Sequence, residues 1–138
     1  MKFYIACSKE NAPLHNHIRN FLIDVRHEIT FDWTRHLTTG KIDRTQLELF
    51  KLGESMKLGV DAADYVVVIL PGGRGTHVEL GMAIIADKPI FLLDVESPKE
   101  DLDFAFYHTA NVHHFKISKF QAIEPSVIFE WAQSGFIP

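Results

Sequence analysis

The chain has 138 residues, of which 46% are hydrophobic, and this predicts one globular domain with a buried core. Its formal net charge is −4, with dispersed Lys and Arg residues and no apolar run of membrane-span length, so we expect neither a nucleic-acid polymer nor a membrane as partner. Cys7 is the only cysteine, which excludes an intramolecular disulfide. Because the N-terminus also lacks a signal-peptide pattern, we expect a cytoplasmic protein.

The N-terminal quarter of the chain predicts a strand, a helix and a second strand. The short apolar run from Phe3 to Cys7 is typical of a buried strand. The apolar residues that follow at helical spacing are Leu14, Ile18, Phe21, Leu22 and Val25. Between Glu28 and Trp33 apolar and polar residues alternate, which predicts a half-exposed strand near a sheet edge. Residues 38–40 then form a loop.

The middle of the chain predicts a long helix and the central strand. Asp43 is placed to cap this helix, which should end between Gly59 and Ala63. Its expected apolar face consists of Leu47, Phe50 and Leu58. Tyr65 to Leu70 is a continuous apolar run, which indicates a strand buried on both faces of a parallel sheet.

The second half of the chain continues the alternation and defines the fold class. Pro71 to Gly75 breaks the chain, after which Thr76 to about Asp87 predicts a helix and Pro89 to Leu93 a buried strand. Val112 to Ile117 predicts a last strand, and about Pro125 to Gln133 a last helix. This order predicts a single α/β domain, doubly wound and flavodoxin-like or Rossmann-like, with a five-stranded parallel sheet.

We expect the site at the turns after the first and the central strand, because ligands of such sheets lie beyond the carboxyl ends of strands where the strand order reverses. Glycines at 72, 73 and 75 let the second turn approach a ligand closely, and the next helix offers free N–H groups. The turn lacks the Gly-Lys-Ser/Thr of a P-loop, and Val78 replaces the third glycine of a dinucleotide fingerprint. The turn therefore favours an anionic or polar ligand, but its sequence does not identify the ligand.

The segment from Thr76 to Glu79 has two interpretations. Ser/Thr-x-x-Glu is the capping box, in which Glu79 bonds back to the backbone of Thr76. A carboxylate in a first helical turn is also stabilised in its ionised form by the helix dipole. At a ligand site such a carboxylate can attack an anomeric carbon and hold a covalent glycosyl intermediate. The pattern leaves both roles open.

Metal-dependent chemistry is not expected. His77-Val78-Glu79 matches the His-x-Glu of zinc deaminases, but these enzymes need a Pro-Cys-x-x-Cys partner that a chain with one cysteine lacks. The remaining histidines show no His-Glu-x-x-His spacing, so we expect no metal and no cofactor. Asp61 and Asp64 precede the central strand, where aspartate usually ends a helix or begins a turn. Asp64 stays a candidate for catalysis.

Three segments of the chain carry a family pattern together: Asp64 to Pro71 (Asp-Tyr-Val-Val-Val-Ile-Leu-Pro), Gly75 to Ala83 (Gly-Thr-His-Val-Glu-Leu-Gly-Met-Ala) and Lys88 to Ile90. Phe3 to Ser8 adds weaker support. They resemble the nucleoside 2'-deoxyribosyltransferase family, whose superfamily includes the 2'-deoxynucleoside 5'-phosphate N-hydrolases and the pyrimidine-nucleotide N-hydrolases. The resemblance implies cleavage of the N-glycosidic bond of a nucleoside or nucleoside 5'-monophosphate, with the sugar passed to another base or to water.

The resemblance also implies roles for individual residues. Glu79 matches the family's nucleophile, and Tyr4 matches a tyrosine of the first strand that positions that carboxylate. Ser8 and Lys9 stand in the turn that contacts the 5'-phosphate in the phosphate-requiring hydrolases. The family commonly builds its site across a subunit interface. This implies a homodimer or higher homo-oligomer, with the segment from Asp101 to Tyr107 near a neighbour's Glu79.

One position departs from the family. The transferases carry an aspartate about six residues before the nucleophile and the phosphate-requiring hydrolases a serine, whereas this chain has Gly73, followed by Arg74. Arg74 can hold an anionic substrate instead. We therefore add Gly73, Arg74, Gly75 and Thr76 to Ser8 and Lys9 as candidate substrate-binding residues.

Two other functions stay open. A TIR-like NAD glycohydrolase also uses a glutamate on a similar sheet, although Gly-Thr-x-x-Glu-Leu-Gly resembles the deoxyribosyltransferase group more. A non-catalytic nucleotide-binding or sensing module, with Glu79 as a helix cap and ribose ligand, is the alternative from another class. The base, the sugar, the need for a 5'-phosphate and the acceptor are not determined by the sequence.

Overall fold

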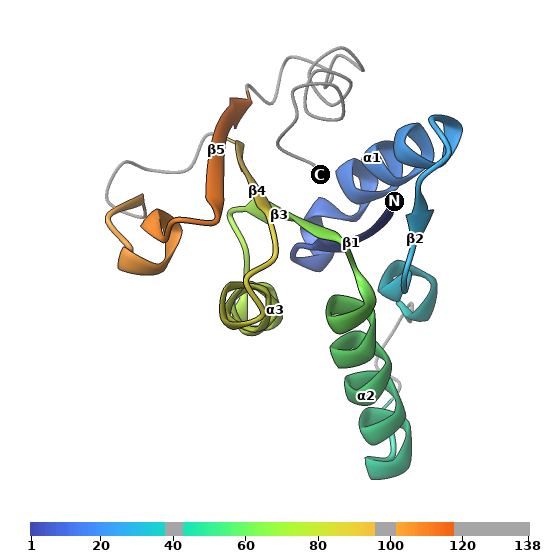
Figure 1. Cartoon of the computed structure of the whole chain (residues 1–138). Coiled ribbons are helices and arrows are strands. Elements are labelled where there is room, and N and C mark those ends of the chain that lie inside the picture. Colours follow the sequence, from blue (N-terminus) through green and yellow to red (C-terminus); the bar gives the residue numbers. More distant parts are fainter. Residues whose placement is uncertain (38–42, 96–101, 118–138) are drawn as a thin grey trace.

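The computed structural model describes residues 1–37, 43–95 and 102–117, and its centre is a five-stranded parallel sheet in the order β2-β1-β3-β4-β5 (Figure 1). The strands are β1 (Lys2–Ala6), β2 (Glu28–Ile29), β3 (Tyr65–Leu70), β4 (Ile90–Val95) and β5 (Val112–Ile117). The helices are α1 (Ala12–Asp24), α2 (Gln46–Ala62) and α3 (Arg74–Ile85), with short 3-10 helices η1 (Lys9–Asn11), η2 (Trp33–His36) and η4 (Ala105–His108). The predicted fold class and the central position of β3 are confirmed. The predicted loop at 38–40 and helix at 125–133 lie outside the described residues.

The sheet is covered on both faces, with α1 on one side and α2 and α3 on the other (Figure 1). Alternate residues of a strand point to opposite faces, so β1 divides its side chains between two cores. Phe3 and Ile5 pack with α1, whereas Tyr4 and Ala6 pack with α2 and α3. All six residues of β3 are buried, which explains their uninterrupted apolar character. No helix of the described residues is long and apolar enough to cross a membrane.

The second strand is shorter than predicted, because β2 ends at Ile29 and not at Trp33. The carboxylate of Asp32 accepts a hydrogen bond from the backbone N–H of Thr34 and starts the turn of η2. The Trp33 indole N–H then donates to the backbone carbonyl of Ile5 at 2.9 Å, where a longer β2 would have paired with β1. A side chain thus completes this edge of the sheet.

Two predictions for α2 were wrong. The helix is capped by Thr45, not by Asp43, and Thr45 and Glu48 form a reciprocal capping box. The expected apolar face is exposed, with Leu47 at 60%, Phe50 at 64% and Leu58 at 59% of their full accessibility. The buried residues of α2 are instead Gly59 and Val60, because only the end of this helix packs on the sheet.

Gly59 allows the end of α2 to approach β1. A β-carbon at this position would lie 2.8 Å from Cβ of Phe31, closer than real side chains come, and 3.0 Å from the ring of Tyr4, which is also tight. Phe31 and Tyr4 therefore both pack against this glycine.

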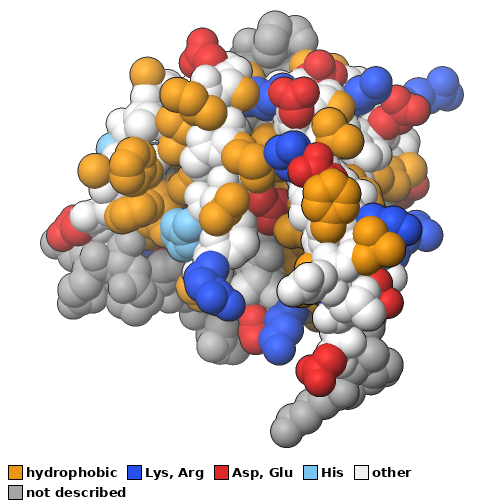
Figure 2. All heavy atoms as spheres, turned by 90° about the horizontal axis from the view of Figure 1, so that it is seen from below, with side chains coloured by type: hydrophobic (Ala, Val, Ile, Leu, Met, Phe, Trp, Pro, Cys, Tyr) orange, Lys and Arg blue, Asp and Glu red, His pale blue; other side chains and the backbone are white. Residues whose placement is uncertain are grey.

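Large apolar side chains also remain exposed on the face that carries α2, α3 and η4. Figure 2 shows hydrophobic side chains gathered over this face. We call it the apolar face and define it by Leu58, Val78, Ile85, Phe104 and Phe106, of which Ile85 is the most exposed at 88%.

Candidate active site

The two turns expected to form the site lie next to each other. The strand order reverses between β1 and β3, so ligands are favoured beyond the carboxyl ends of these two strands. The Asn11 side-chain amide donates to the carbonyl of Pro71 at 3.0 Å and joins the turn after β1 to the turn after β3. Ser8 and Lys9 of the first turn and Gly73 to Gly75 of the second are thus brought to one edge of the sheet.

The start of α3 shows that Glu79 is not a helix cap. The helix begins at Arg74, two residues earlier than predicted, with Gly73 as an N-cap that has no side chain. Thr76 is therefore already the third helical residue, and Glu79 lies in the second turn. The capping-box interpretation of Thr76 and Glu79 is wrong for this reason, since neither side chain bonds to the free backbone of the helix start.

Glu79 is buried against the sheet beside Tyr4. The glutamate is 3% exposed and the tyrosine 0%. Oε2 of Glu79, the hydroxyl of Tyr4 and the hydroxyl of Thr76 all lack a hydrogen-bond partner within the described part of the chain. Buried polar atoms are nearly always paired in folded proteins, so these unpaired atoms are candidate partners for a ligand.

The electrostatics of the site follow from this burial. Desolvation raises the pKa of Glu79 to about 7, and the Tyr4 hydroxyl opposes this shift. Burial, and then the charge of Glu79, raises the pKa of Tyr4 above its usual range and that of Cys7 to about 12. The expectation that the helix dipole holds Glu79 in its ionised form is wrong, because the carboxylate lies beyond the first turn and desolvation dominates. The carboxyl group is instead poised to ionise near neutral pH.

Glycines around Glu79 keep the start of α3 close to the carboxylate. A β-carbon at Gly75 would lie 3.8 Å from Oε1 of Glu79, so this oxygen reaches the first turn of the helix. A β-carbon at Gly72 would lie 2.5 Å from the side chain of Thr76, so only glycine fits beside this buried threonine. Gly73 and Arg74, in contrast, are exposed.

Asp64 is not part of this site. It precedes β3 and lies at the amino ends of β1 and β3, whereas Glu79 and the two turns lie toward their carboxyl ends. Its carboxylate accepts a hydrogen bond from the backbone N–H of Lys2 at 2.7 Å and so ties the starts of the two strands together. The structure thus gives Asp64 a structural contact in place of the catalytic role we had considered.

Sequence reasoning missed two polar contacts near Glu79. His77 bonds through Nδ1 to the carbonyl of Gly73 at 2.7 Å and through Nε2 to the hydroxyl of Tyr107 at 2.5 Å. The segment 102–107 therefore packs on α3 of its own chain. Its contact with a neighbouring subunit stays a prediction, and Asp101 lies outside the described residues.

Sequence reasoning also missed Asp94, which is 6% exposed. A single acidic residue at the end of an apolar strand is a signal that can be recognised in the sequence.

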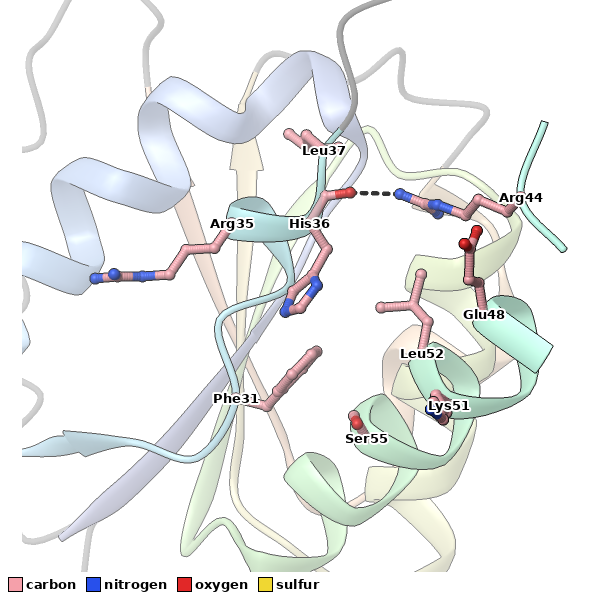
Figure 3. Close-up of a pocket in the computed structure, with 9 residues that line it drawn as sticks. All are labelled: Phe31, Arg35, His36, Leu37, Arg44, Glu48, Lys51, Leu52 and Ser55. Carbon is pink, nitrogen blue, oxygen red and sulfur yellow. Dashed lines mark hydrogen bonds between the residues drawn. The ribbon is translucent and has the colours of Figure 1, made fainter. Parts of the chain in front are cut away.

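A pocket of about 520 Å³ opens between η2 and α2 (Figure 3). Its lining residues are Phe31, Arg35, His36, Leu37, Arg44, Glu48, Lys51, Leu52 and Ser55. The rings of Phe31 and His36 stack 5.2 Å apart on one wall, opposite Leu52 and Ser55 of α2. Arg44 donates to the carbonyl of His36 at the rim. Phe31 of this pocket and Tyr4 of the site both pack against Gly59. The pocket therefore lies close to the buried part of the site.

No group of three or more His, Cys, Asp or Glu side chains among residues 1–37, 43–95 and 102–117 could hold a metal ion. The chemistry of the described residues is that of a carboxyl group beside a phenol, next to a glycine-rich helix start.

Comparison with known proteins adds a structural likeness. No protein-family model matches the sequence, and no curated protein matches it. The structure is similar to that of the CMP N-glycosidase of Clostridium botulinum, with a TM-score of 0.63 and 16% identity over 96% of this chain and 99% of that one. It is also similar to a conserved protein from Enterococcus faecalis V583, with a TM-score of 0.56 and 18% identity over 97% and 98% of the two chains. At these identities the likeness shows a shared fold over nearly the full length.

Proposed function

We propose that this protein cleaves the N-glycosidic bond of a nucleoside or a nucleoside 5'-monophosphate with Glu79 as the nucleophile. The observation that carries the proposal is the buried Glu79 carboxyl group, which has one oxygen without a partner and lies beside the buried hydroxyl of Tyr4. The fold shared with a CMP N-glycosidase supports the same chemistry. Carboxyl groups whose pKa is strongly raised by desolvation cluster at functional sites.

The reaction proceeds in two steps. The ionised Glu79 attacks C1' of the sugar, so a bond forms between C1' and the carboxylate oxygen while the bond from C1' to the base nitrogen breaks. The electron pair of that bond leaves with the base, which takes up a proton from solvent. Water, or a second base, then attacks C1' and gives up a proton to solvent, while the bond from C1' to Glu79 breaks and its electron pair restores the carboxylate. The Tyr4 hydroxyl positions the carboxylate and favours its ionised form, as its effect on the pKa of Glu79 indicates.

The surroundings of Glu79 suggest how the substrate is oriented. A 5'-phosphate would bind at the turns after β1 and β3, which carry Ser8, Lys9 and Arg74 and lead to the free N–H groups of α3. The base then points toward Tyr4 and the pocket beyond Gly59, where the stacked rings of Phe31 and His36 offer a flat wall. In this orientation C1' of the sugar lies between the 5'-phosphate and the base, beside Glu79.

A substrate panel tests the function. The protein is incubated with nucleosides, nucleoside 5'-monophosphates (CMP and cytidine first) and NAD, and released bases are resolved by chromatography. We expect release of a base from a nucleoside or its monophosphate. Nicotinamide release from NAD alone would favour a TIR-like glycohydrolase, and binding without any release would favour a sensing module.

Replacing Arg74 tests the proposed phosphate site. Arg74→Ala should weaken binding of a nucleoside 5'-monophosphate by about 1.5–3 kcal/mol, the range for a hydrogen bond to a charged group, and leave the nucleoside unaffected. Titration calorimetry with both ligands measures the difference. Lys57→Ala, which removes an exposed cation of α2 outside the proposed site, is the control. Equal losses for nucleoside and nucleotide would show that Arg74 does not bind phosphate.

We also propose that the protein is a homo-oligomer that buries the apolar face. Large exposed apolar side chains that gather on one face, as these do in Figure 2, are typical of protein interfaces. Ile85→Glu should convert the oligomer to monomer in sedimentation at micromolar concentration, because it places a charge in the middle of the buried contact. Ile23→Glu, on α1 at the opposite face of the sheet, should not. A wild-type protein that sediments as a fully active monomer would contradict this proposal.

A further inference from the structure

The contact between Tyr107 and His77 reaches the helix start that the proposed phosphate site uses. His77 lies one turn into α3 and donates from its backbone N–H to the carbonyl of its N-cap Gly73 at 3.2 Å. Nδ1 of the same residue is 2.7 Å from the same carbonyl. A carbonyl oxygen can only accept, so Nδ1 carries the proton and the Gly73 carbonyl receives two bonds from one residue.

The tautomer of His77 is in turn matched by Tyr107. With the proton on Nδ1, Nε2 of neutral His77 is an acceptor, and the Tyr107 hydroxyl donates to it at 2.5 Å. Tyr107 is 5% exposed. Phe104 lies edge-on to both rings, 4.9 Å from Tyr107 and 5.7 Å from His77, and His114 of β5 bonds to the backbone carbonyl of Tyr107. These contacts hold Tyr107 in place independently of its bond to His77.

This arrangement fixes the direction of the first N–H of α3. The peptide unit between Gly73 and Arg74 is planar and trans, so its N–H points opposite to its carbonyl. Because His77 holds the carbonyl toward the helix, the N–H of Arg74 points out from the helix start. Glycines at 72, 73 and 75 would otherwise leave this segment free to adopt many conformations. The hydroxyl of Thr76 in the same turn is buried and has no partner among the described residues, so it is a second, independent group at this helix start that a ligand can complete.

We propose that Tyr107 and His77 are positioning residues for the 5'-phosphate: they orient the backbone of Gly73 and Arg74 and touch neither the sugar nor the base. This inference rests on the proposed function for the identity of its ligand. It predicts that the pair acts on nucleotides selectively, because a nucleoside lacks the 5'-phosphate that would bind at the helix start.

Tyr107→Phe removes the hydroxyl and keeps the ring contacts. Its matched control is Tyr65→Phe, since Tyr65 is also buried and its hydroxyl also bonds to a histidine, His27 at 2.6 Å, but at the amino end of β3, away from the proposed phosphate site. Binding is measured by calorimetry in the Glu79→Gln background for the best-bound nucleoside 5'-monophosphate and its nucleoside. We expect Tyr107→Phe to raise the Kd of the nucleotide about tenfold, or about 1.4 kcal/mol, and to leave the nucleoside unchanged. Tyr65→Phe should change neither.

In the absence of ligand, amide hydrogen exchange provides a second readout. Tyr107→Phe should speed exchange of the His77 amide, which donates to the Gly73 carbonyl, and Tyr65→Phe should not. Equal nucleotide affinities for the two variants, or equal losses for nucleotide and nucleoside, would overturn the positioning role. If wild type binds no nucleotide, the proposed function and this phosphate role fall together. Faster exchange in Tyr107→Phe would then still support the orientation of the helix start, and unchanged exchange would overturn that as well.

Discussion

Glu79→Gln is expected to slow glycosidic cleavage at least about a thousandfold, which corresponds to roughly 4 kcal/mol of transition-state stabilisation. The amide has nearly the same shape as the carboxyl group but cannot ionise and is a poor nucleophile. Because Glu79 does not cap α3, the variant should keep the fold and the substrate affinity. Initial rates and calorimetric Kd values, measured on the same preparation, separate the loss of chemistry from a loss of binding.

The control for this variant is Glu54→Gln, which removes a partly exposed carboxylate from α2 outside the proposed site. It should retain the wild-type rate. A Glu79→Gln protein that turns over at the wild-type rate would eliminate Glu79 as nucleophile, whereas parallel losses of affinity and rate would indicate a binding role.

Glu79→Gln should also change how stability depends on pH. The carboxyl group has an ordinary pKa of 4.5 when unfolded and about 7 when folded, so between these values the folded state holds a proton that the unfolded state has lost. The stability from this group is therefore fully present below about pH 4.5 and is lost as pH rises through about 7. The loss amounts to about 3 kcal/mol of unfolding free energy. Glutamine cannot ionise, so the Glu79→Gln variant does not lose this stability.

Urea unfolding of both proteins at pH 4.5 and pH 8 measures this effect. The difference in unfolding free energy should shift by about 3 kcal/mol in favour of glutamine between the two pH values. His15, whose pKa burial lowers to about 4, titrates equally in both proteins and cancels. In wild type, kcat/KM should rise with pH through about 7, because only the ionised carboxylate attacks. A constant difference between the proteins, or activity that falls over this range, would contradict the assigned environment of Glu79.

The fold could be predicted because its signals are local. The run from Tyr65 to Leu70 is apolar throughout, as both its faces are buried, and the strand and helix patterns alternate along the chain. The faces of α2 could not be predicted, since Leu47, Phe50 and Leu58 are as apolar as core residues and only tertiary packing shows that they are exposed. Trp33 likewise fits the alternating pattern of a strand. In the structure its indole N–H instead bonds to the carbonyl of Ile5, and the strand ends before this residue.

The site was only partly predictable for the same reason. The resemblance identified Glu79 and Tyr4, which do lie together. The start of α3 depends on the backbone of Gly73, which has no side chain to signal a cap, so Thr76 was mistaken for one. The contact of His77 with Tyr107 joins residues 30 positions apart and has no local pattern. Asp64 was an avoidable error, because an acid directly before a strand lies at the amino end of the sheet.

The central claim, a covalent bond between the sugar and Glu79, is tested most directly by trapping it. A 2'-fluoro analogue of the best substrate slows breakdown of the glycosyl ester, and the protein is then analysed by intact and peptide mass spectrometry. We predict that the wild-type protein gains the mass of one fluorinated sugar on the peptide that contains Glu79, while the Glu79→Gln variant gains none. Repeated release of base from the analogue with no added mass on the protein, or an adduct on another residue, would contradict the claim.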